Sequence, residues 1–543
     1  MFRVEPSNSG SGVSRPRLLL EILAATLIGV AIGVGVVLLG EIEAKYRAAI
    51  MVVALLGASI VFLPDRRFLL LLAWIFVMPL GMEKIIDTGI TIGPEFLPQY
   101  IVFNAGDVLI LFMGLLMLTE SIITGRNPLR WSSLASVWTA LLIWSSISFI
   151  LHEHYLRDGN DSLSVLNLLS GVRTLALIVV VQSAIRGQGE LVAVLLVLAF
   201  ALAFQAGVVV ASYVTGEVFN FAGLTGGLSL DLNTFGNGAA IRATGTVGYV
   251  NEQAAFHTFW TLPLIALLAT RRAVVRNVAL VAISASGVAI LLTFARGAWF
   301  AAGLATVLTT IVFISRGWLT RSGWLKLAIV GAAASVLLAG LSYQISLRLT
   351  PRGDDGATES RIRMIALALD LWREHPIIGV GPGEFVEAAY RLEPPYLKSQ
   401  IWLEPGEATR SGPLGRLEVG RASTREGRPA MVPVPVHNRY LLSMAELGVP
   451  GLVLWVLLIG VLLPEAYRCL RSQNLFYQYF GVSAFALITA LGSYWMVDLF
   501  VTDKVLQIIF LPLALLCAAA RHVRTGGARK GDRAEDNDLD ASR

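Results

Sequence analysis

Apolar segments long enough to cross a lipid bilayer recur along almost the whole chain, and they constrain its fold more than any other feature. A membrane-spanning helix needs about 20 apolar residues. The candidate segments are 18–40, 48–63, 67–82, 105–123, 131–151, 163–185, 190–214, 247–270, 275–293, 297–315, 324–345, 449–464, 477–499 and 505–520. Only 15% of the 543 residues are charged, whereas soluble domains carry about 25%. We therefore predict an all-α, polytopic transmembrane helical bundle of about 12–14 spans.

The distribution of basic residues predicts how the chain is oriented in the membrane. Lys and Arg gather in the cytoplasmic loops of membrane proteins. Basic clusters around Arg66, Arg271 and Arg468 alternate with neutral or acidic loops such as 83–104 and 152–162. Both ends of the chain also carry basic clusters, so we expect both termini to be cytoplasmic. The net charge of +5 then reflects topology and not nucleic-acid binding, because no basic run alternates with stacking aromatic residues.

This orientation divides the chain into five parts. The first apolar segment is longer than the core of a signal peptide and is expected to be a membrane anchor. The predicted parts are a cytoplasmic N-terminus (1–17), a transmembrane bundle of about eleven spans (18–345), a large outer loop containing helices (346–448), C-terminal spans (449–520) and a disordered cytoplasmic tail (521–543). Loops as long as the third part are usually functional or disordered. A second hydrophilic loop, 215–246, is predicted on the same side.

The large outer loop contains three recognisable stretches. Residues 358–372 carry apolar side chains at helical spacing, which predicts an amphipathic helix that stops before Pro376. The segment Gly379–Phe385 is rich in glycine but lacks the Lys-Ser/Thr pair of a phosphate-binding loop, so it predicts a tight turn after that helix. Residues 393–435 are rich in Pro, Gly and Arg without periodicity and are predicted to be irregular.

Arg173 is the clearest functional candidate inside a predicted span. It lies about ten residues into the segment 163–185, which is roughly 15 Å along a helix. A charge at that depth is costly and therefore usually functional or paired. The alternative is a structural arginine that reaches the membrane interface or pairs with a membrane carboxylate such as Asp107 or Asp498.

Arg242, Asn251 and Arg296 all lie where an outer loop meets a predicted span. Arg296 occupies a hairpin of two or three residues between two spans. Several guanidinium groups at one membrane level suit bidentate recognition of phosphate. Arg361 and Arg363, on the predicted loop helix, are secondary candidates, and a solvated helix face is the alternative for them.

His437 starts the last part of the outer loop, which is predicted to be a helix that breaks at Gly448 before the next span. Its imidazole lies at the outer membrane surface beside Asn438 and Arg439, where it could act as a general base near neutral pH. The alternative is a histidine at a helix start that binds backbone groups.

No metal site and no cofactor are predicted. His152 and His154 lie close together but lack a third ligand, and His257 is expected to be packed inside a span. The two cysteines suit neither a disulfide framework nor a zinc cluster. Asp-x-Asp pairs occur only in the tail, at 536–540. These features disfavour a metal-dependent nucleotide-sugar transferase.

The order of several short motifs resembles the O-antigen ligase and O-antigen polymerase family. The motifs are Arg242…Gly245…Asn251, Thr293-Phe294-Ala295-Arg296-Gly297-Ala298, Ser360-Arg361…Pro376…Gly379-Val380-Gly381…Phe385 and His437-Asn438…Ala445-Glu446…Gly448. The resemblance covers about residues 160–465. The chain departs from the family at Ala295, where Ser is usual, and at 393–435, which looks like an insertion.

The resemblance implies a metal-independent, inverting membrane glycosyltransferase with the C-type architecture. It would reside in the bacterial inner membrane with its active site facing the periplasm, and it would assemble a cell-envelope glycan such as lipopolysaccharide or exopolysaccharide. The donor would be a glycan on undecaprenyl pyrophosphate, and the acceptor a lipid or glycan hydroxyl. Carried over to this chain, Arg173, Arg242 and Arg296 bind the pyrophosphate and His437 is the base. The secondary substrate-binding candidates are Asn251, Asn438, Arg361 and Arg363.

A multi-span transporter or flippase of lipid-linked sugars is the competing interpretation. Many spans and intramembrane charges suit such a protein equally well. The absence of an internal repeat and the large outer loop that ends in His-Asn favour a transferase. A structural scaffold is a third interpretation, but it gives no reason for arginines gathered at one depth.

Overall fold

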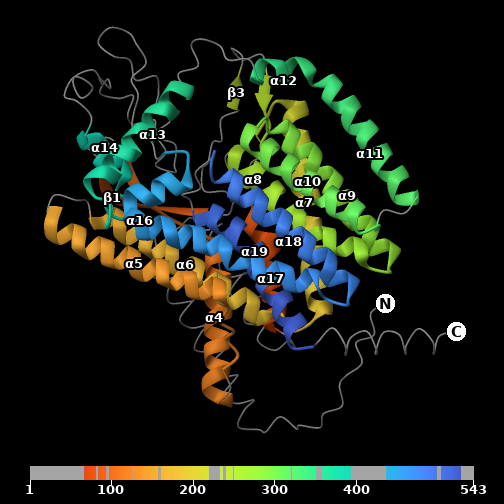
Figure 1. Cartoon of the computed structure of the whole chain (residues 1–543), viewed down its shortest axis with the longest axis horizontal. Helices are drawn as coiled ribbons and strands as arrows, with labels where there is room; N and C mark the ends of the chain where they lie inside the picture. Colours follow the sequence, from red (N-terminus) through yellow and green to blue (C-terminus); the bar gives the residue numbers. More distant parts are fainter. Residues whose placement is uncertain are drawn as a thin grey trace, which may run out of the picture. The chain divides into compact units, whose positions relative to one another are not determined.

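Helices make up most of the chain in the computed structural model (Figure 1). The structure describes residues 66–80, 83–92, 97–125, 127–156, 161–218, 233–235, 240–248, 250–318, 321–349, 357–392, 436–497 and 503–526. The predicted spans 18–40 and 48–63, the segment 393–435 and Asp498 therefore lie outside the described residues. The chain divides into two units, 1–70 and 71–543, and every contact described below lies within the second.

The helices follow the apolar segments because a helix satisfies its own backbone hydrogen bonds where lipid offers none. They are α3 (Arg66–Val77), η1 (Met78–Leu80), α4 (Ala105–Thr124), α5 (Ser133–Leu156), α6 (Asp161–Ala184), α7 (Gln188–Thr215), α8 (Val250–Thr261), η2 (Leu262–Ala269), α9 (Ala273–Leu292), α10 (Arg296–Ser315), α11 (Arg321–Gly340), α12 (Ser342–Leu349), α13 (Ala357–Glu374), α14 (Phe385–Leu392), α16 (Arg439–Gly460), α17 (Leu462–Leu470), α18 (Leu475–Tyr494) and α19 (Asp503–Arg524). The elements η1 and η2 are 3-10 helices.

Nine helices in the described part of the chain are long and apolar enough to cross a membrane. They cover Gly106–Thr124, Ser133–His152, Ser164–Ala184, Gln188–Thr215, Ala273–Leu292, Arg296–Ser315, Arg439–Leu470, Leu475–Tyr494 and Val505–Arg524. The number of spans is below the predicted 12–14 partly because two predicted spans lie outside the described residues. Three other predicted segments do not form one long apolar helix. The segment 247–270 is shared between α8 and the 3-10 helix η2, and 324–345 is shared between α11 and α12. The apolar helix at Arg67–Leu80 is shorter than a full span.

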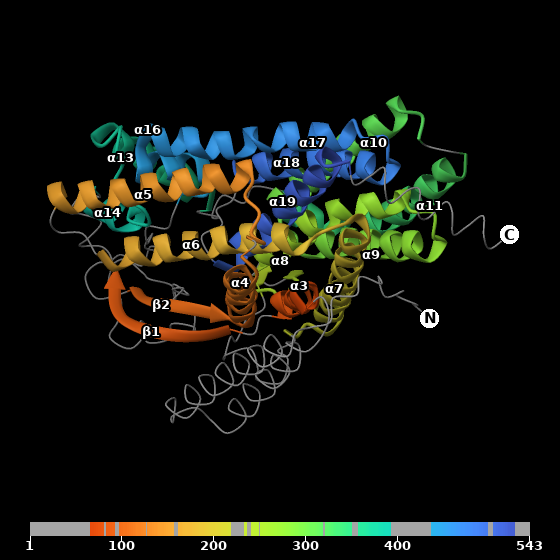
Figure 2. The same cartoon turned by 90° about the horizontal axis from the view of Figure 1, so that it is seen from below.

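Two short antiparallel sheets occur where the sequence predicted only loops. Strands β1 (Glu83–Ile92) and β2 (Leu97–Asn104) pair from Glu83 with Asn104 to Ile92 with Leu97 (Figure 2). Strands β3 (Asn233–Phe235) and β4 (Ala240–Arg242) form the second sheet. The β-branched and aromatic residues in 83–104 favour strands, but the acidic character of this loop led to its assignment as a loop. The second hairpin lies in the loop 215–246, which was predicted only as a hydrophilic loop.

The helices α18 and α19 are the most buried of the nine spans, whereas α10 exposes most of its apolar surface. Helix α18 packs against α10, α17 and η2, and α19 packs against α6, α8 and α17. Exposed apolar side chains such as Val307 and Ile311 on α10 suit contact with lipid. The C-terminal end of α18 thereby lies among helices that come from distant parts of the sequence.

Candidate functional site

Arg242 is fixed at the junction of β4, α8 and the turn that joins α9 to α10. Its Nε donates a hydrogen bond to the carbonyl oxygen of Thr293 at 3.1 Å, and its Nη2 donates to Oδ1 of Asn251 at 2.8 Å. The neighbouring backbone N–H of Ala243 donates to the carbonyl oxygen of Leu292 at 3.1 Å. The structure thus brings together Arg242, Asn251 and the hairpin before Arg296.

The hairpin before Arg296 consists of the residues between the end of α9 at Leu292 and the start of α10. Phe294 in this turn is fully buried and has a φ of 51°. A bulky residue in that left-handed conformation costs about 1–3 kcal/mol and persists only where packing enforces it. Hydrogen bonds support the turn on both sides, because the Thr293 hydroxyl and the Trp299 indole both donate to the carbonyl oxygen of Ile290.

Arg296 is the first residue of α10 and its side chain is exposed. No side chain in the described part of the chain forms an ion pair or hydrogen bond with its guanidinium. No side chain caps the helix at Ala295 either. The positive end of the helix dipole and the guanidinium both favour an anion at this place.

Arg242, Asn251 and the hairpin before Arg296 together form what we call the arginine junction. The C-terminal end of α18 adjoins it. The Tyr494 hydroxyl donates to the carbonyl oxygen of Asn251 at 3.4 Å. A Cβ added to Gly297, in the first turn of α10, would lie 3.0 Å from a methyl group of Val497 and 3.9 Å from the ring of Tyr494. The end of α18 is therefore in close contact with both α8 and α10.

The same end of α18 holds the start of α16. Asn438 caps α16, because its Oδ1 accepts from the N–H of Leu441 at 3.0 Å, while its Nδ2 donates to the carbonyl oxygen of Met496 at 3.2 Å. The N–H of Arg439 donates to the carbonyl oxygen of Trp495 at 2.8 Å. Both ends of the Asn438 amide thus serve to position His437, which is half-buried immediately before it.

A backbone clamp attaches the outer loop to α16 at the kink where Gly448 interrupts the helix. The N–H groups of Val380 and Gly381 donate to the carbonyl oxygens of Ala445 and Glu446, each at 3.0 Å, and one further bond joins Val449 to Pro376. The predicted turn at Gly379–Phe385 is therefore confirmed, and it is a docking element. The predicted helix 358–372 is also confirmed, since α13 spans Ala357–Glu374.

Side chains from other helices reinforce this clamp. The carboxylate of Glu446 accepts hydrogen bonds from the N–H groups of Gly383 and Phe385, at the start of α14. From α5, the Trp144 indole donates to the carbonyl oxygen of Leu447 at 2.8 Å, and the Ser148 hydroxyl donates to that of Ile378 at 2.7 Å. The outer-loop helices are thus held to the membrane helices through polar contacts.

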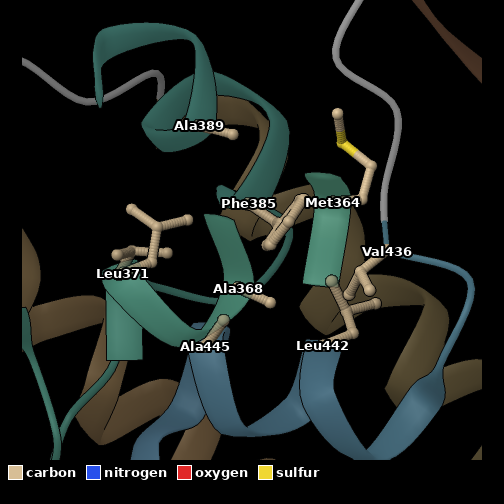
Figure 3. Packing of buried hydrophobic residues seen from close by; sticks show 9 residues of the cluster. Met364, Ala368, Leu371, Phe385, Ala389, Val436, Leu442 and Ala445 are labelled. Atoms are coloured by element: carbon tan, nitrogen blue, oxygen red, sulfur yellow. The ribbon is translucent and has the colours of Figure 1, made fainter. Parts of the chain in front are cut away.

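An apolar core lies behind the clamp, between α13, α14 and the first two turns of α16 (Figure 3). Its buried members are Met364, Ala368, Leu371, Val380, Phe385, Ala389, Val436, Leu442 and Ala445. Because Val436 directly precedes His437, this core fixes the segment that leads into α16.

Arg173 lies in a second polar cluster. Its Nη1 is 3.2 Å from Oδ2 of Asp107 on α4, and Gln507 on α19 donates to Oδ1 of the same carboxylate at 2.6 Å. The ion pair with Asp107 was one of the two alternatives for a structural role. Arg361 and Arg363 lie on α13, and their side chains are outside the described part of the structure.

Several supporting residues were missed by the sequence analysis. Tyr494, Gln205 and Gln253 all hold residues of the arginine junction or of the loop beside it. A signal for the two glutamines existed, because polar side chains within apolar spans are rarely placed without a partner. His257 is packed inside the bundle, as predicted, and its ring contacts Gln253 and Ser286.

Metal-binding arrangements are absent from the part of the chain that the structure describes. No group of three or more His, Cys, Asp or Glu residues there could hold a metal ion. Cys469 and Cys517 are both buried and free.

The long apolar helices define a multi-pass helical membrane protein. Within this chain, a family model described as O-antigen ligase matches residues 279–406, which run from within α9 to beyond α14. This match confirms the resemblance to the O-antigen ligase family, and together with the spans it supports a membrane O-antigen ligase-type role. No curated protein matches the chain.

Proposed function

We propose that this protein is a membrane glycosyltransferase that moves a glycan from undecaprenyl pyrophosphate to an acceptor hydroxyl on the periplasmic face of the bacterial inner membrane. The reaction is metal-independent and inverts the anomeric centre. It belongs to cell-surface polysaccharide assembly of the O-antigen ligase or polymerase type.

The observation that carries this proposal is that the arginine junction and the segment at His437 both contact the C-terminal end of α18. Residues 494–497 contact Asn251 and Gly297 on one side and hydrogen-bond to Asn438 and Arg439 on the other. Cationic groups and a potential base from helices far apart in the sequence thus adjoin the same short segment. A transfer reaction requires both kinds of group within reach of one substrate.

The chemistry of the donor explains why arginines suit this place. When the anomeric carbon leaves undecaprenyl pyrophosphate, negative charge develops on the leaving phosphate oxygen. Fixed cations stabilise that charge in the transition state without reorganising. Arg242, held by Asn251 and Thr293, and Arg296, at the start of α10, supply them in this proposal.

His437 supplies the base. Its imidazole accepts the proton of the acceptor hydroxyl as the acceptor oxygen bonds to the anomeric carbon and the bond to the pyrophosphate breaks. The acceptor attacks the face opposite the leaving group, which inverts the configuration. Asn438 positions this histidine through its cap on α16.

Arg173 is also proposed to contact the donor pyrophosphate. Its ion pair with Asp107 must then be shared with the donor or exchanged when the donor binds. Asn251 takes the role of orienting Arg242, while Arg361 and Arg363 stay secondary candidates for substrate binding.

Glycan transfer by purified variants tests the proposal. We expect His437→Ala to lower kcat by about 10²–10⁴-fold with little change in donor KM. Arg242→Gln and Arg296→Gln should raise donor KM by roughly ten- to a hundredfold and also lower kcat, because both groups stabilise charge in the transition state. Arg316→Gln is the matched control, because Arg316 is an exposed arginine at the opposite end of α10 and should leave both constants unchanged. Near-normal turnover by His437→Ala would remove it as the base.

A transporter or flippase of lipid-linked sugars is the alternative function. The same assay separates the two, because transfer proceeds in detergent while transport needs a sealed compartment. Formation of a new glycosidic linkage by the detergent-solubilised protein supports the transferase, and its absence alongside movement of lipid-linked glycan in vesicles supports the transporter.

A further inference from the structure

Two glutamines lie fully buried in apolar helices beside the arginine junction. Gln205 is in α7 and Gln253 is in α8, and neither has any solvent-exposed surface. Burying an amide costs free energy unless its donors and acceptor are satisfied. Two buried amides close together therefore indicate that both form specific hydrogen bonds with a neighbouring segment.

Both glutamines bind the loop that follows Arg242. The Gln205 amide nitrogen donates to the carbonyl oxygen of Pro79 at 2.9 Å and to the Thr246 hydroxyl at 2.6 Å, while its oxygen accepts from the Thr246 N–H at 3.1 Å. The Gln253 oxygen accepts from the Val247 N–H at 3.3 Å. Residues 246 and 247 are thereby fixed through backbone as well as side-chain groups.

The loop is pressed tightly against these two side chains. A Cβ added to Gly245 would lie 2.5 Å from the Gln205 oxygen and 2.6 Å from the Gln253 oxygen. Glycine permits that approach without displacing either glutamine side chain, which gives a physical reason for the glycine in the motif Arg242…Gly245…Asn251. The Thr244 hydroxyl closes the loop by donating to the carbonyl oxygen of Gly248 at 2.7 Å.

The position of this loop determines the position of Arg242. Residues 243–248 connect Arg242 directly to the start of α8, where Asn251 accepts from its guanidinium. At the other end, the Ala243 N–H is bonded to Leu292 at the end of α9. Movement of Thr246 away from Gln205 would therefore shift the backbone that carries the guanidinium.

We infer that Gln205 is a positioning residue that holds the 243–248 loop so that Arg242 presents its guanidinium to the donor. The inference rests on the proposed function, in which Arg242 binds the donor pyrophosphate. A displacement of about 1 Å at such a contact lowers its contribution strongly, so a buried amide on α7 controls donor affinity through the loop without touching the donor.

Donor kinetics of purified, full-length variants test this role. Gln205→Met keeps the size of the side chain but removes both hydrogen-bonding groups. We expect donor KM to rise by about tenfold or more, with a fall in kcat no larger than that of Arg242→Gln. Ser212→Ala is the matched control on the same helix, since the Ser212 hydroxyl is buried without a hydrogen-bond partner in the described residues. Its donor KM should equal that of the unmodified protein.

A second pair of variants covers the case in which Gln205→Met does not fold. Thr246→Val removes the hydroxyl that Gln205 and Pro79 bind, and Thr246→Ser keeps it. We expect Thr246→Val to raise donor KM and Thr246→Ser to restore it. Equal KM values for the two Thr246 variants would overturn the inference.

A double-mutant cycle distinguishes positioning from general stabilisation. If Gln205 acts through Arg242, then Gln205→Met has no further effect on donor KM in the Arg242→Gln background. Independent, multiplying effects would overturn the inference while leaving the proposed function standing. An unchanged donor KM in Arg242→Gln alone would overturn both, and a raised value for Arg242→Gln with an unchanged value for Gln205→Met would overturn the inference alone.

Discussion

Gly379 and Gly448 allow the outer loop and α16 to approach backbone to backbone. Both have positive φ, +70° and +67° respectively, a conformation that glycine adopts without strain. A Cβ at Gly379 would lie 2.2 Å from the carbonyl carbon of Glu446, and one at Gly448 would lie 2.0 Å from the carbonyl oxygen of Ile377. Each glycine therefore permits the clamp because it has no Cβ.

We predict that Gly379→Ala destabilises the protein by about 3 kcal/mol, because the backbone atoms that it would meet cannot move without opening the clamp. Thermal unfolding in detergent measures this. Gly125→Ala is the control for conformation alone, since Gly125 has a φ of +63° with nothing within 4 Å of an added Cβ, and it should cost only about 1 kcal/mol. Equal losses of stability in the two variants would show that the close approach at Gly379 contributes nothing.

At the scale of the helices, Asp107 joins α4, α6 and α19 through a single carboxylate. It pairs with Arg173 and accepts from Gln507, and its own side chain is only 9% exposed. Charges in such a place are tolerated because they neutralise each other, and removing one partner leaves the other unpaired. The cluster therefore gives Arg173 a structural role beside its proposed role in donor binding.

The two roles of Arg173 can be separated by neutralising both partners. We predict that Arg173→Gln lowers the unfolding free energy by about 2 kcal/mol. This value is smaller than for a fully buried ion pair because the Arg173 side chain is one-fifth exposed. Adding Asp107→Asn should recover most of that stability, because the unpaired charge disappears. Donor KM should stay high in the double variant, as measured by glycan transfer. Recovery of donor KM together with stability would leave Arg173 with the structural role alone.

Elements whose signal is local could be predicted from the sequence. The amphipathic period of 358–372 and the stop at Pro376 predicted α13. The sequence also placed Arg242 and Asn251 where a loop enters an apolar segment, but their hydrogen bond was found only in the structure. The strands in 83–104 were not predicted because the acidic charge of the segment was interpreted as a loop between spans. Its β-branched residues were not considered.

Contacts between distant segments could not be predicted in the same way. The sequence offered two carboxylates, Asp107 and Asp498, as possible partners of Arg173, and the ion pair with Asp107 follows from the packing of α4 against α6. The bond between Gln205 and Thr246 depends on how α7 lies against α8, which no local pattern encodes. The same is true of the meeting of Asn438 with the end of α18.

For the whole molecule, the C-terminal end of α18 lies at the centre of the proposed site. Helices α8, α10 and α16 reach it from three separate regions of the chain (Figure 1), and the clamp ties the outer loop to the same helix α16. The arginine junction and His437 are thereby supported by different helices but share one anchor. In the proposed function, the lipid-linked donor and the acceptor both bind beside residues 494–497.

The most direct test is an experimental structure of the protein with an undecaprenyl-pyrophosphate-linked glycan bound. The account predicts pyrophosphate oxygens within about 3 Å of the guanidinium groups of Arg242 and Arg296, with the first sugar on the side of His437. A pyrophosphate bound at the opposite membrane face, or away from both arginines, would contradict it.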